Sequence, residues 1–325
     1  METKIILGDA FELIKSIPDQ SVDLVLTSPP YGIGKEYEKR SKNVDEYIEG
    51  FIPLLDEIKR VLKPTGSVCW QVGNRIEGAS HEHKASESKS KPAPETYPLE
   101  FYFYFEFKKL GFLLRNNIAW VSRNTIPFRD QKFLTGQHEA VLWFTKGDDY
   151  YCDIDSIRVP QKYPDKKYFY KDGNYTRVRF PNPKGKNPGD AWEIVLSTHS
   201  NERWDHPAQF PEELVRRLIL MSCPVGGTVL DPFAGVATTL KVAQDLERVG
   251  IGFEKEPKYY NQALLRLNGV DQKGQMSLDT DWKKVMPRFD AHNDVHTDIL
   301  LGWKGIPLPE QERPLLSDQA SKTFR

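Results

Sequence analysis

Two short polar loops carry the side chains of this sequence that could do chemistry, and the first begins at Thr27. The run Ser28-Pro29-Pro30-Tyr31 follows an apolar stretch of branched residues, 22–26. Two consecutive prolines remove two backbone donors and fix two φ angles, so the loop is stiff and its carbonyls are freed from strand pairing. A small hydroxyl, freed carbonyls and an aromatic ring suit a flat ligand with an exocyclic amine, such as a nucleobase.

The second loop, Asp231-Pro232-Phe233-Ala234-Gly235, also follows an apolar run and precedes a helical pattern. Its small residues let a ligand approach the backbone closely, and a helix N-terminus follows it. Glu254 ends the next apolar run, where an acid can hold ribose hydroxyls, and Asp9 ends another, where it could bond a base edge. There is no complete GxGxxG and no phosphate-type lysine, so the loop predicts a nucleoside without a pyrophosphate.

Alternating strand and helix patterns must position these two loops. Because strands alternate with helices, we expect a doubly wound α/β fold with a mostly parallel sheet. No helical pattern separates 117–121 from 139–144, so these two strands should pair like a hairpin. In such sheets the ligand lies at the carboxyl ends of the strands, where strand order reverses, and both loops leave such ends. The predicted strands are 4–7, 22–26, 67–72, 117–121, 139–144, 228–230 and 249–253, and the predicted helices are 11–17, 44–62 (with Pro53 a kink or a new start), 101–107, 211–223, 237–246 and 257–267.

Three segments stand apart from this pattern. Residues 78–98 are polar and rich in serine and proline, which predicts a mobile surface loop. Residues 148–200 lack a helical pattern and collect positive charge among aromatic residues, which is typical of nucleic-acid binding, although a basic run can also be a solvated face. Residues 271–325 have no period that predicts a structure. The candidate nucleic-acid-contacting residues are Lys162, Lys166, Lys167, Lys171, Arg177 and Arg179.

Composition bounds the class of protein. The 325 residues are 39% hydrophobic and 28% charged with a net charge of −1, which describes an ordinary globular chain and requires any basic surface to be local. Three cysteines without CxxC spacing indicate a reducing compartment. We see no signal peptide and no membrane-spanning run, so we expect a cytoplasmic protein. His81-Glu82-His83 is the one candidate metal cluster, and in a polar loop we expect no metal there.

Taken together and in this order, the two loops resemble those of the S-adenosylmethionine-dependent amino-methyltransferases of DNA. The catalytic loop precedes the basic region, and the cofactor loop follows it, as in the permuted beta group of these enzymes. Further similarity lies at 62–67, 138–144 and 206–211, and the resemblance covers roughly residues 4–268. It implies a Rossmann-like methyltransferase sheet with an antiparallel hairpin strand and a small irregular target-recognition region. The domains would be a catalytic half (1–147), a recognition region (148–200), a cofactor-binding half (201–270) and a C-terminal extension of unknown role (271–325).

The resemblance assigns roles by position. Ser28 and the Pro29 carbonyl would hold the target amine, with Pro30 in the same loop, and Tyr31 would stack on a flipped-out base. Ala237 stands where the family has glycine, which adds a methyl group beside the cofactor. S-adenosylmethionine would be bound by Asp9, Ala10, Thr27, Gln209, Asp231, Pro232, Phe233, Gly235, Thr238 and Glu254.

The implied reaction is methylation of the exocyclic N4 amine of cytosine in double-stranded DNA, as part of a restriction–modification system with a cognate endonuclease. Serine at the first catalytic position is more similar to the cytosine-N4 enzymes, and adenine-N6 methylation remains the alternative. A non-catalytic DNA-binding relic also stays open. An amino-methyltransferase that acts on RNA or on protein glutamine usually carries the cofactor motif before the catalytic motif. The opposite order in this sequence argues against that class. Methylation at carbon 5 of cytosine needs a nucleophilic cysteine thiolate, usually directly after a proline. Cys223 instead precedes Pro224, which argues against that reaction.

Overall fold

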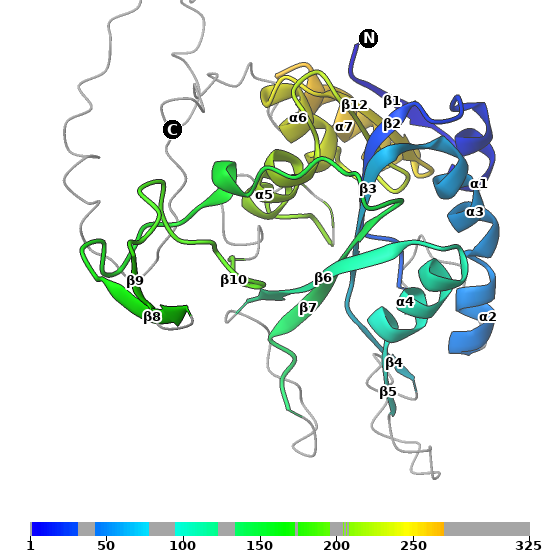
Figure 1. Ribbon diagram of the computed structural model, residues 1–325. Helices are drawn as coiled ribbons and strands as arrows, with labels where there is room; N and C mark the ends of the chain where they lie inside the picture. Colours follow the sequence, from blue (N-terminus) through cyan, green and yellow to red (C-terminus); the bar gives the residue numbers. More distant parts are fainter. Residues whose placement is uncertain are drawn as a thin grey trace, which may run out of the picture. The chain divides into compact units, whose positions relative to one another are not determined.

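A central β-sheet organises the computed structural model of the protein (Figure 1). The structure describes residues 2–31, 43–77, 95–122, 134–172, 175–195, 204, 206 and 208–269. Within these ranges eight strands form the sheet. In spatial order they are β1 (Lys4–Leu7), β12 (Val249–Glu254), β11 (Thr228–Asp231), β2 (Val22–Thr27), β3 (Leu62–Val72), β7 (His138–Thr145), β6 (Leu113–Val121) and β10 (Ala191–Glu193).

The pairing confirms the predicted mostly parallel sheet. β7 runs antiparallel to β3 and to β6, and the other neighbouring strands pair in parallel. From β2 the chain continues to β3 on one side, whereas from β11 it continues to β12 on the other. Strand order therefore reverses between β2 and β11, and this is the point where ligands bind in open α/β sheets.

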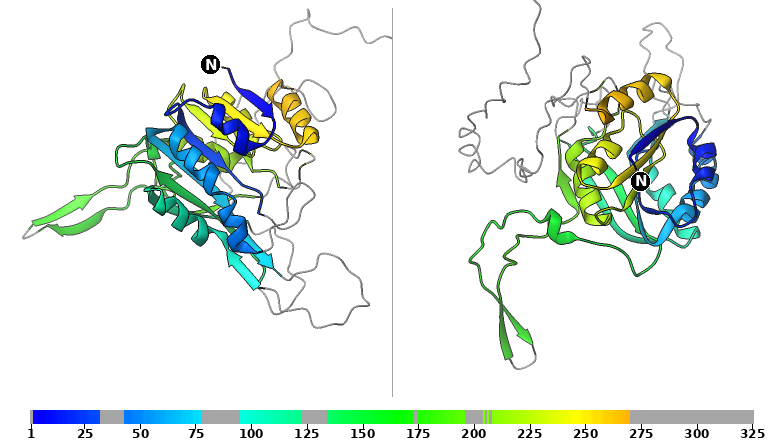
Figure 2. Two further views of the ribbon diagram at one scale, coloured as in Figure 1. Left: turned by 90° about the vertical axis from the view of Figure 1, so that its right-hand side faces the viewer. Right: turned by 90° about the horizontal axis from the view of Figure 1, so that it is seen from above.

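Helices cover both faces of the sheet (Figures 1 and 2). Leu24 and Leu26 on β2 pack into the core on one face, and Val25 packs into the core on the other. This alternation is what a strand buried on both faces requires. One face carries α1 (Ala10–Leu13), the 3-10 turn η1 (Ile14–Ser16), α2 (Val44–Glu49), α3 (Ile52–Val61) and α4 (Leu99–Lys109), and the other carries α5 (Glu212–Ser222), α6 (Thr238–Asp245) and α7 (Pro257–Leu267).

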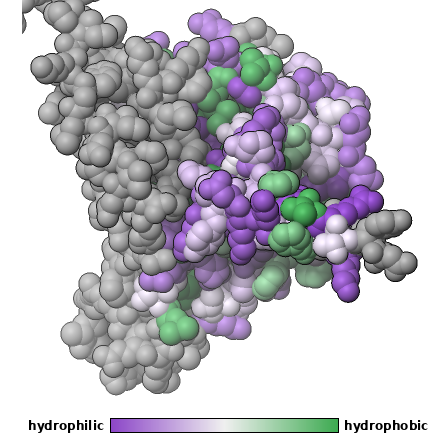
Figure 3. Space-filling model, turned by 60° about the vertical axis from the view of Figure 1, so that its left-hand side comes forward, coloured by the Kyte–Doolittle hydropathy of each residue, from purple (hydrophilic) through white to green (hydrophobic). Residues whose placement is uncertain are grey.

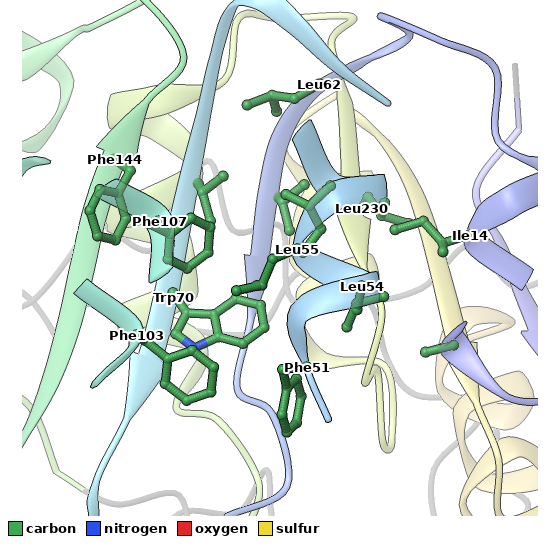
Figure 4. Close-up of a cluster of buried hydrophobic side chains, with 14 of the residues drawn as sticks. Ile14, Phe51, Leu54, Leu55, Leu62, Trp70, Phe103, Phe107, Phe144 and Leu230 are labelled. Atoms are coloured by element: carbon green, nitrogen blue, oxygen red, sulfur yellow. The ribbon is translucent and has the colours of Figure 1, made fainter. Parts of the chain in front are cut away.

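The helix α4 forms from a sequence, Phe101 to Phe107, whose residue types favour strands. Phe103 and Phe107 lie four residues apart, are completely buried and pack at an angle against the ring of Trp70 of β3, as Figure 4 shows. Phe101 and Phe105 point to the opposite side and are largely exposed. Tertiary packing thus overrides local propensity here, and the helix predicted from the neighbouring elements is confirmed.

The structure corrects three predicted boundaries. The strand expected at 67–72 begins already at Leu62, since residues 62–66 continue along β2 through a register shift. Of the predicted 78–98 loop, Glu95–Pro98 is strand β5 and pairs with β4 (Asn74–Glu77). β10 lies inside the predicted 148–200 region yet belongs to the main sheet. Residues 78–94, with His81-Glu82-His83, lie outside the described residues.

The basic region forms a separate two-stranded sheet. β8 (Tyr168–Asp172) and β9 (Tyr175–Arg179) pair with each other in antiparallel fashion, and Figure 2 shows them extending away from the main sheet. A bridge between Val159 and Lys186 closes the base of this hairpin. Just before the bridge, the 3-10 turn η2 (Ile154–Ile157) packs against α5.

The chain divides into two units by its internal contacts, Met1–Pro287 and Arg288–Arg325. The second unit, and with it the predicted extension 271–325, lies outside the described residues. In the part that the structure describes, no helix is long and apolar enough to cross a membrane.

Candidate active site

A cavity of about 810 Å³ opens at the carboxyl ends of β2 and β11, and both predicted loops line it. Loops separated by about 200 residues in the chain therefore share one hollow. Its volume lies in the range of small-molecule sites, roughly 300–1,000 Å³. Among the predicted site residues, those that line the cavity are Asp9, Ala10, Ser28, Pro29, Pro30, Tyr31, Gln209, Asp231, Pro232, Phe233, Gly235, Thr238 and Glu254.

Thr27 is the exception among the predicted cofactor residues. Its side chain is completely buried and is not part of the cavity lining. The Thr27 hydroxyl instead donates a hydrogen bond of 2.6 Å to Asp231 Oδ1, because β2 and β11 are neighbours in the sheet. Thr27 therefore orients the carboxylate that faces the cavity, and the prediction of direct cofactor contact is not supported.

Asp231 is the most deeply buried acid of the cavity, with 2% of its surface exposed. Its Oδ1 accepts from Thr27 and, at 3.1 Å, from the Phe233 N–H. Burial raises the pKa of this carboxyl to about 6, although these hydrogen bonds favour the charged form. The site therefore holds a carboxylate at neutral pH that a cationic ligand group would stabilise.

The backbone after Asp231 turns through two left-handed positions. Gly235 has φ +54°, and a Cβ there would lie 3.2 Å from His206 Nε2. Ala237 has φ +60° and immediately precedes α6. A left-handed residue that carries a Cβ costs about 1–2 kcal/mol, which is the physical reason why glycine suits the position of Ala237.

Arg266 of α7 holds the end of this loop, at Val236 and Thr238, by hydrogen bonds. Its guanidinium donates to the Thr238 hydroxyl at 2.8 Å, to the Val236 carbonyl at 3.4 Å and to Glu212 of α5. Arg266 is 4% exposed, so its charge is balanced inside the protein by Glu212. Arg266 thus links helices α5, α6 and α7 beside the cavity loop.

Two further acids, Glu254 and Asp9, line the cavity. Glu254 Oε1 accepts from the Glu256 N–H at 2.7 Å, and burial raises the pKa of Glu254. Asp9 caps α1 by accepting from the Phe11 N–H at 3.0 Å, and its second oxygen lies 3.1 Å from Lys255 Nζ. These carboxylates are the acceptors that hydroxyl and amino groups of a nucleoside require.

Beside Phe233, two aromatic rings that the motifs did not predict add to an apolar wall of the cavity. The ring of Phe51 lies 5.8 Å from that of Phe11 and 6.0 Å from that of Phe233, and all three line the cavity. Phe51 belongs to the helical run 44–62, where its spacing indicated only core. His206 and Tyr259 also line the cavity, with ring centres 4.5 Å apart.

Tyr31, the last residue of the catalytic loop, is held by hydrogen bonds to side chains of β3 and β7. Its hydroxyl lies 2.8 Å from Glu139 Oε2, 3.0 Å from Gln71 Oε1 and 3.4 Å from the Ser28 hydroxyl. Burial and the Glu139 charge hold its pKa well above the usual value, so the phenol is protonated. The Tyr47 hydroxyl donates to the Pro30 carbonyl at 2.7 Å, which fixes the loop on its other side.

The cysteines do not supply a nucleophile. Cys69 and Cys223 are buried outside the cavity lining, and burial raises the pKa of each thiol to about 12. Cys152 is exposed and also absent from the lining. A carbon-5 mechanism through a thiolate therefore has no residue to carry it among those that line the cavity.

The predicted basic residues lie apart from the cavity. They are exposed and belong to the β8–β9 hairpin or to the segment that leads into it, and none lines the cavity: Lys162, Lys166, Lys167, Lys171, Arg177 and Arg179. Figure 3 shows the described surface on this side as mostly hydrophilic, with small hydrophobic patches among the hydrophilic residues. Large exposed side chains on or beside the hairpin include Phe169, Val178 and Phe180.

Comparisons with known proteins identify the family. A family model described as DNA methylase, of the N6/N4 methyltransferase type, matches residues 22–265. The type II methyltransferase M.BglII of Bacillus subtilis is 38% identical over 267 residues, which cover 82% of this chain and 69% of that protein. This match extends over most of both chains.

Solved structures share the fold. The cytosine-N4-specific PvuII DNA methyltransferase aligns with a TM-score of 0.61 at 22% identity, over 84% of this chain and 88% of the other. A protein of Thermus thermophilus, described as a putative DNA modification methylase in complex with S-adenosyl-L-methionine, aligns with a TM-score of 0.54 at 24% identity, over 82% and 93%. The resemblance inferred from the two loops is confirmed, and this chain belongs to the N6/N4 DNA methylase family.

Proposed function

We propose that this protein transfers a methyl group from S-adenosylmethionine to the exocyclic N4 amine of a cytosine in double-stranded DNA. The observation that carries the proposal is the single cavity lined by Ser28-Pro29-Pro30-Tyr31 on one side and Asp231-Pro232-Phe233 on the other. Membership of the DNA methylase family supports the reaction class. Serine before the two prolines, and the name of the PvuII structural neighbour, favour cytosine N4 over adenine N6.

The cavity residues fit the cofactor. Asp231 offers a buried carboxylate to the cationic methionine part, and Phe233 lies beside it. Glu254 would accept the ribose hydroxyls, and Asp9 would accept from the adenine amine. Gly235 leaves room that a Cβ would fill. When bound, S-adenosylmethionine supplies an electrophilic methyl group on a sulfonium.

The catalytic loop would prepare the amine for attack. The lone pair of the cytosine amine is delocalised into the ring, so the free amine is a poor nucleophile. The Ser28 hydroxyl and the Pro29 carbonyl would accept its hydrogens out of the ring plane and localise the lone pair on nitrogen. Tyr31 would hold the base by stacking. Catalysis then consists of orientation and preorganised acceptors, without a covalent enzyme intermediate.

DNA would reach the cavity by base flipping. A base in the duplex cannot enter a hollow of this kind until it leaves the stack, at a cost of a few kcal/mol. The β8–β9 hairpin offers exposed Lys171, Arg177 and Arg179 to the phosphate backbone, and Lys162, Lys166 and Lys167 precede it. In this proposal 148–200 is the recognition region between catalytic (1–147) and cofactor-binding (201–270) halves.

The biological setting is proposed from the relatives. M.BglII carries the name of a type II methyltransferase. A type II methyltransferase protects the sites that a partner endonuclease cuts, so we infer a restriction–modification role. The test is to methylate DNA with this protein and then digest it with an endonuclease encoded beside its gene. Resistance of the methylated DNA to cleavage would support this role, and cleavage despite full methylation would contradict it.

Methyl transfer from labelled S-adenosylmethionine to unmethylated genomic DNA tests the function. The wild-type protein should bind the cofactor in equilibrium dialysis and label DNA, whereas a non-catalytic relic should do neither. Ser28→Ala should keep cofactor binding and lose most transfer. Ser16→Ala is the matched control, because the Ser16 hydroxyl is exposed, donates to the Leu13 carbonyl and lies outside the cavity lining. Full transfer by Ser28→Ala would contradict the assigned role.

A further inference from the structure

Glu139 lies directly behind the catalytic loop, at the start of β7, and the proposed reaction does not yet use it. It does not line the cavity. Its Oε2 accepts from the Tyr31 hydroxyl at 2.8 Å and from the side-chain amide of Gln71. The Ser28 hydroxyl, which does line the cavity, donates to the Tyr31 oxygen at 3.4 Å. A continuous hydrogen-bonded path therefore runs from the cavity through Ser28 and Tyr31 to a carboxylate.

The number of protons on each side chain determines which group donates in each hydrogen bond of this path. The phenol has one proton and two nearby acceptors, Glu139 Oε2 and Gln71 Oε1. The carboxylate is closer and charged, and charged acceptors form the stronger bonds. The Gln71 amide also donates to Glu139, so the two side chains of β3 and β7 hold each other in place. The phenol proton thus points to Glu139, and the Tyr31 oxygen is left to accept from Ser28.

The reaction must release one proton from the amine. An amine that has accepted a methyl group carries one proton more than the product. Within the catalytic loop Ser28 is the side chain proposed to touch this amine, and a neutral hydroxyl is a poor final base. A positioned base reached by hydrogen bonds accelerates reactions of this kind by about 10²- to 10⁴-fold.

We propose that Glu139 is the terminal proton acceptor of the methyl transfer, reached through Ser28 and Tyr31. As the methyl group is transferred to the amine, the N–H bond breaks and its electron pair stays on nitrogen. The proton passes to Ser28 Oγ, the serine proton passes to the Tyr31 oxygen, and the phenol proton passes to Glu139 Oε2. Ser28 and Tyr31 each gain and lose one proton, so the net result is a protonated Glu139. The half-buried carboxyl then exchanges its proton with water.

The surroundings of Glu139 suit this role. The neighbouring strands present uncharged groups, Gln71 from β3 and Trp120, the register partner of Glu139, from β6. Gly73 passes close by, and a Cβ there would lie 3.2 Å from Glu139 Cδ. From the catalytic loop, the facing titratable group is the phenol of Tyr31. Glu139 acts on the substrate through other side chains, and a purely structural role as an anchor for Tyr31 is the competing explanation.

Glu139→Gln separates the two explanations, because glutamine can still hydrogen-bond to Tyr31 and Gln71 but accepts no proton at neutral pH. With enzyme in excess over DNA sites, the single-turnover rate of methyl transfer should fall about 100-fold or more. The affinity for S-adenosylmethionine should stay within twofold. With S-adenosylmethionine saturating at every pH, so that protonation of Asp231 does not limit the rate, the acid limb of the pH–rate profile should disappear. Glu139→Asp keeps the carboxyl and should retain the acid limb at a reduced rate.

Glu95→Gln is the matched control. Glu95 of β5 also accepts from a tyrosine hydroxyl, that of Tyr97 at 2.7 Å, but this hydrogen bond is exposed and neither residue lines the cavity. This variant should behave as the wild type. Tyr31→Phe breaks the path while it leaves Glu139 in place, and it should also lose the acid limb. It serves as the deciding variant if Glu139→Gln does not fold, as judged by circular dichroism.

The inference rests on the proposed function, and the two fail in different ways. If the wild-type protein transfers no methyl group to DNA, the proposed function is wrong. If the wild type is active and Glu139→Gln transfers at the wild-type rate with an unchanged acid limb, the relay is wrong and the function stands. A slow Glu139→Gln that keeps the acid limb would assign Glu139 the anchoring role only.

Discussion

At the scale of single residues, burial decides the chemistry of Asp231. Its pKa is raised to about 6 by burial, from an ordinary value near 3.9. In our account the ionised carboxylate faces the cationic methionine part of the cofactor. Affinity for S-adenosylmethionine should therefore be constant above pH 7 and weaken below pH 6, by about tenfold per pH unit. Equilibrium dialysis between pH 5 and pH 8 measures this directly.

The same raised pKa acts on stability with the opposite sign. In the unfolded chain Asp231 releases its proton near pH 4, whereas in the folded protein it holds the proton up to about pH 6. Its contribution to the free energy of unfolding is thus largest below pH 4 and is lost as the pH rises through 6. Asp231→Asn should remove both pH dependences, and binding by the wild type that is equally tight at pH 5 and pH 8 would contradict the assignment.

Thr27 tunes this carboxylate, and a near-isosteric change tests its role. Thr27→Val removes the 2.6 Å hydrogen bond that favours the charged form of Asp231. The pKa of Asp231 should rise further, so the midpoint of cofactor binding against pH should move upward. Thr96→Val on the exposed strand β5 is the control and should leave the midpoint unchanged. A midpoint that does not move in Thr27→Val would show that this bond has no influence on the site.

At the scale of elements, α7 stabilises the cofactor loop through Arg266. Arg266→Met leaves Glu212 without its partner and frees the Thr238 hydroxyl and the Val236 carbonyl. Loss of one member of a buried pair costs about 3–5 kcal/mol, and partial exposure of Glu212 favours the lower end. Urea unfolding should show a loss of about 3 kcal/mol. Lys15→Met, which breaks the exposed Lys15–Glu12 pair, should cost less than about 0.5 kcal/mol.

The β8–β9 hairpin should contribute to DNA affinity and not to cofactor binding. If Arg177 and Arg179 each contact a phosphate, replacing both with alanine should reduce the slope of log K against log salt by about 1.8, since each contact contributes about 0.9. Cofactor affinity should not change. The double variant Lys4→Ala/Lys15→Ala removes the same charge from elsewhere and should leave the slope unchanged. Equal slopes for the wild type and the arginine variant would exclude the hairpin as the phosphate contact.

Periodicity predicted most elements, and the misses have a common cause. Helix α7 begins and ends at the residues expected, and Pro53 marks the first turn of a new helix, α3. Five strands were missed, β4, β5, β8, β9 and β10, because each has only three to five residues, which is too short to show a clear alternation. Such strands form because a neighbouring strand offers them hydrogen bonds, which is a tertiary effect.

At the scale of the whole molecule, the two motifs predicted the site because each ends a strand at the point where strand order reverses. Thirteen of the fourteen predicted catalytic and cofactor residues line the cavity, Thr27 being the exception. The residues that were missed act through space and carry no local signature. Phe51 belongs to a helical core pattern, whereas Glu139 and Arg266 are recognised only by their hydrogen-bond partners.

The most direct test of the account is the identity of the modified base. Unmethylated genomic DNA is incubated with the wild-type protein and S-adenosylmethionine, digested to nucleosides and analysed by mass spectrometry, with Ser28→Ala as the control. We predict N4-methyldeoxycytidine in the wild-type reaction alone. N6-methyldeoxyadenosine would contradict the assignment of cytosine, and the absence of any methylated nucleoside would contradict the claim that the cavity brings a methyl donor and an amine together.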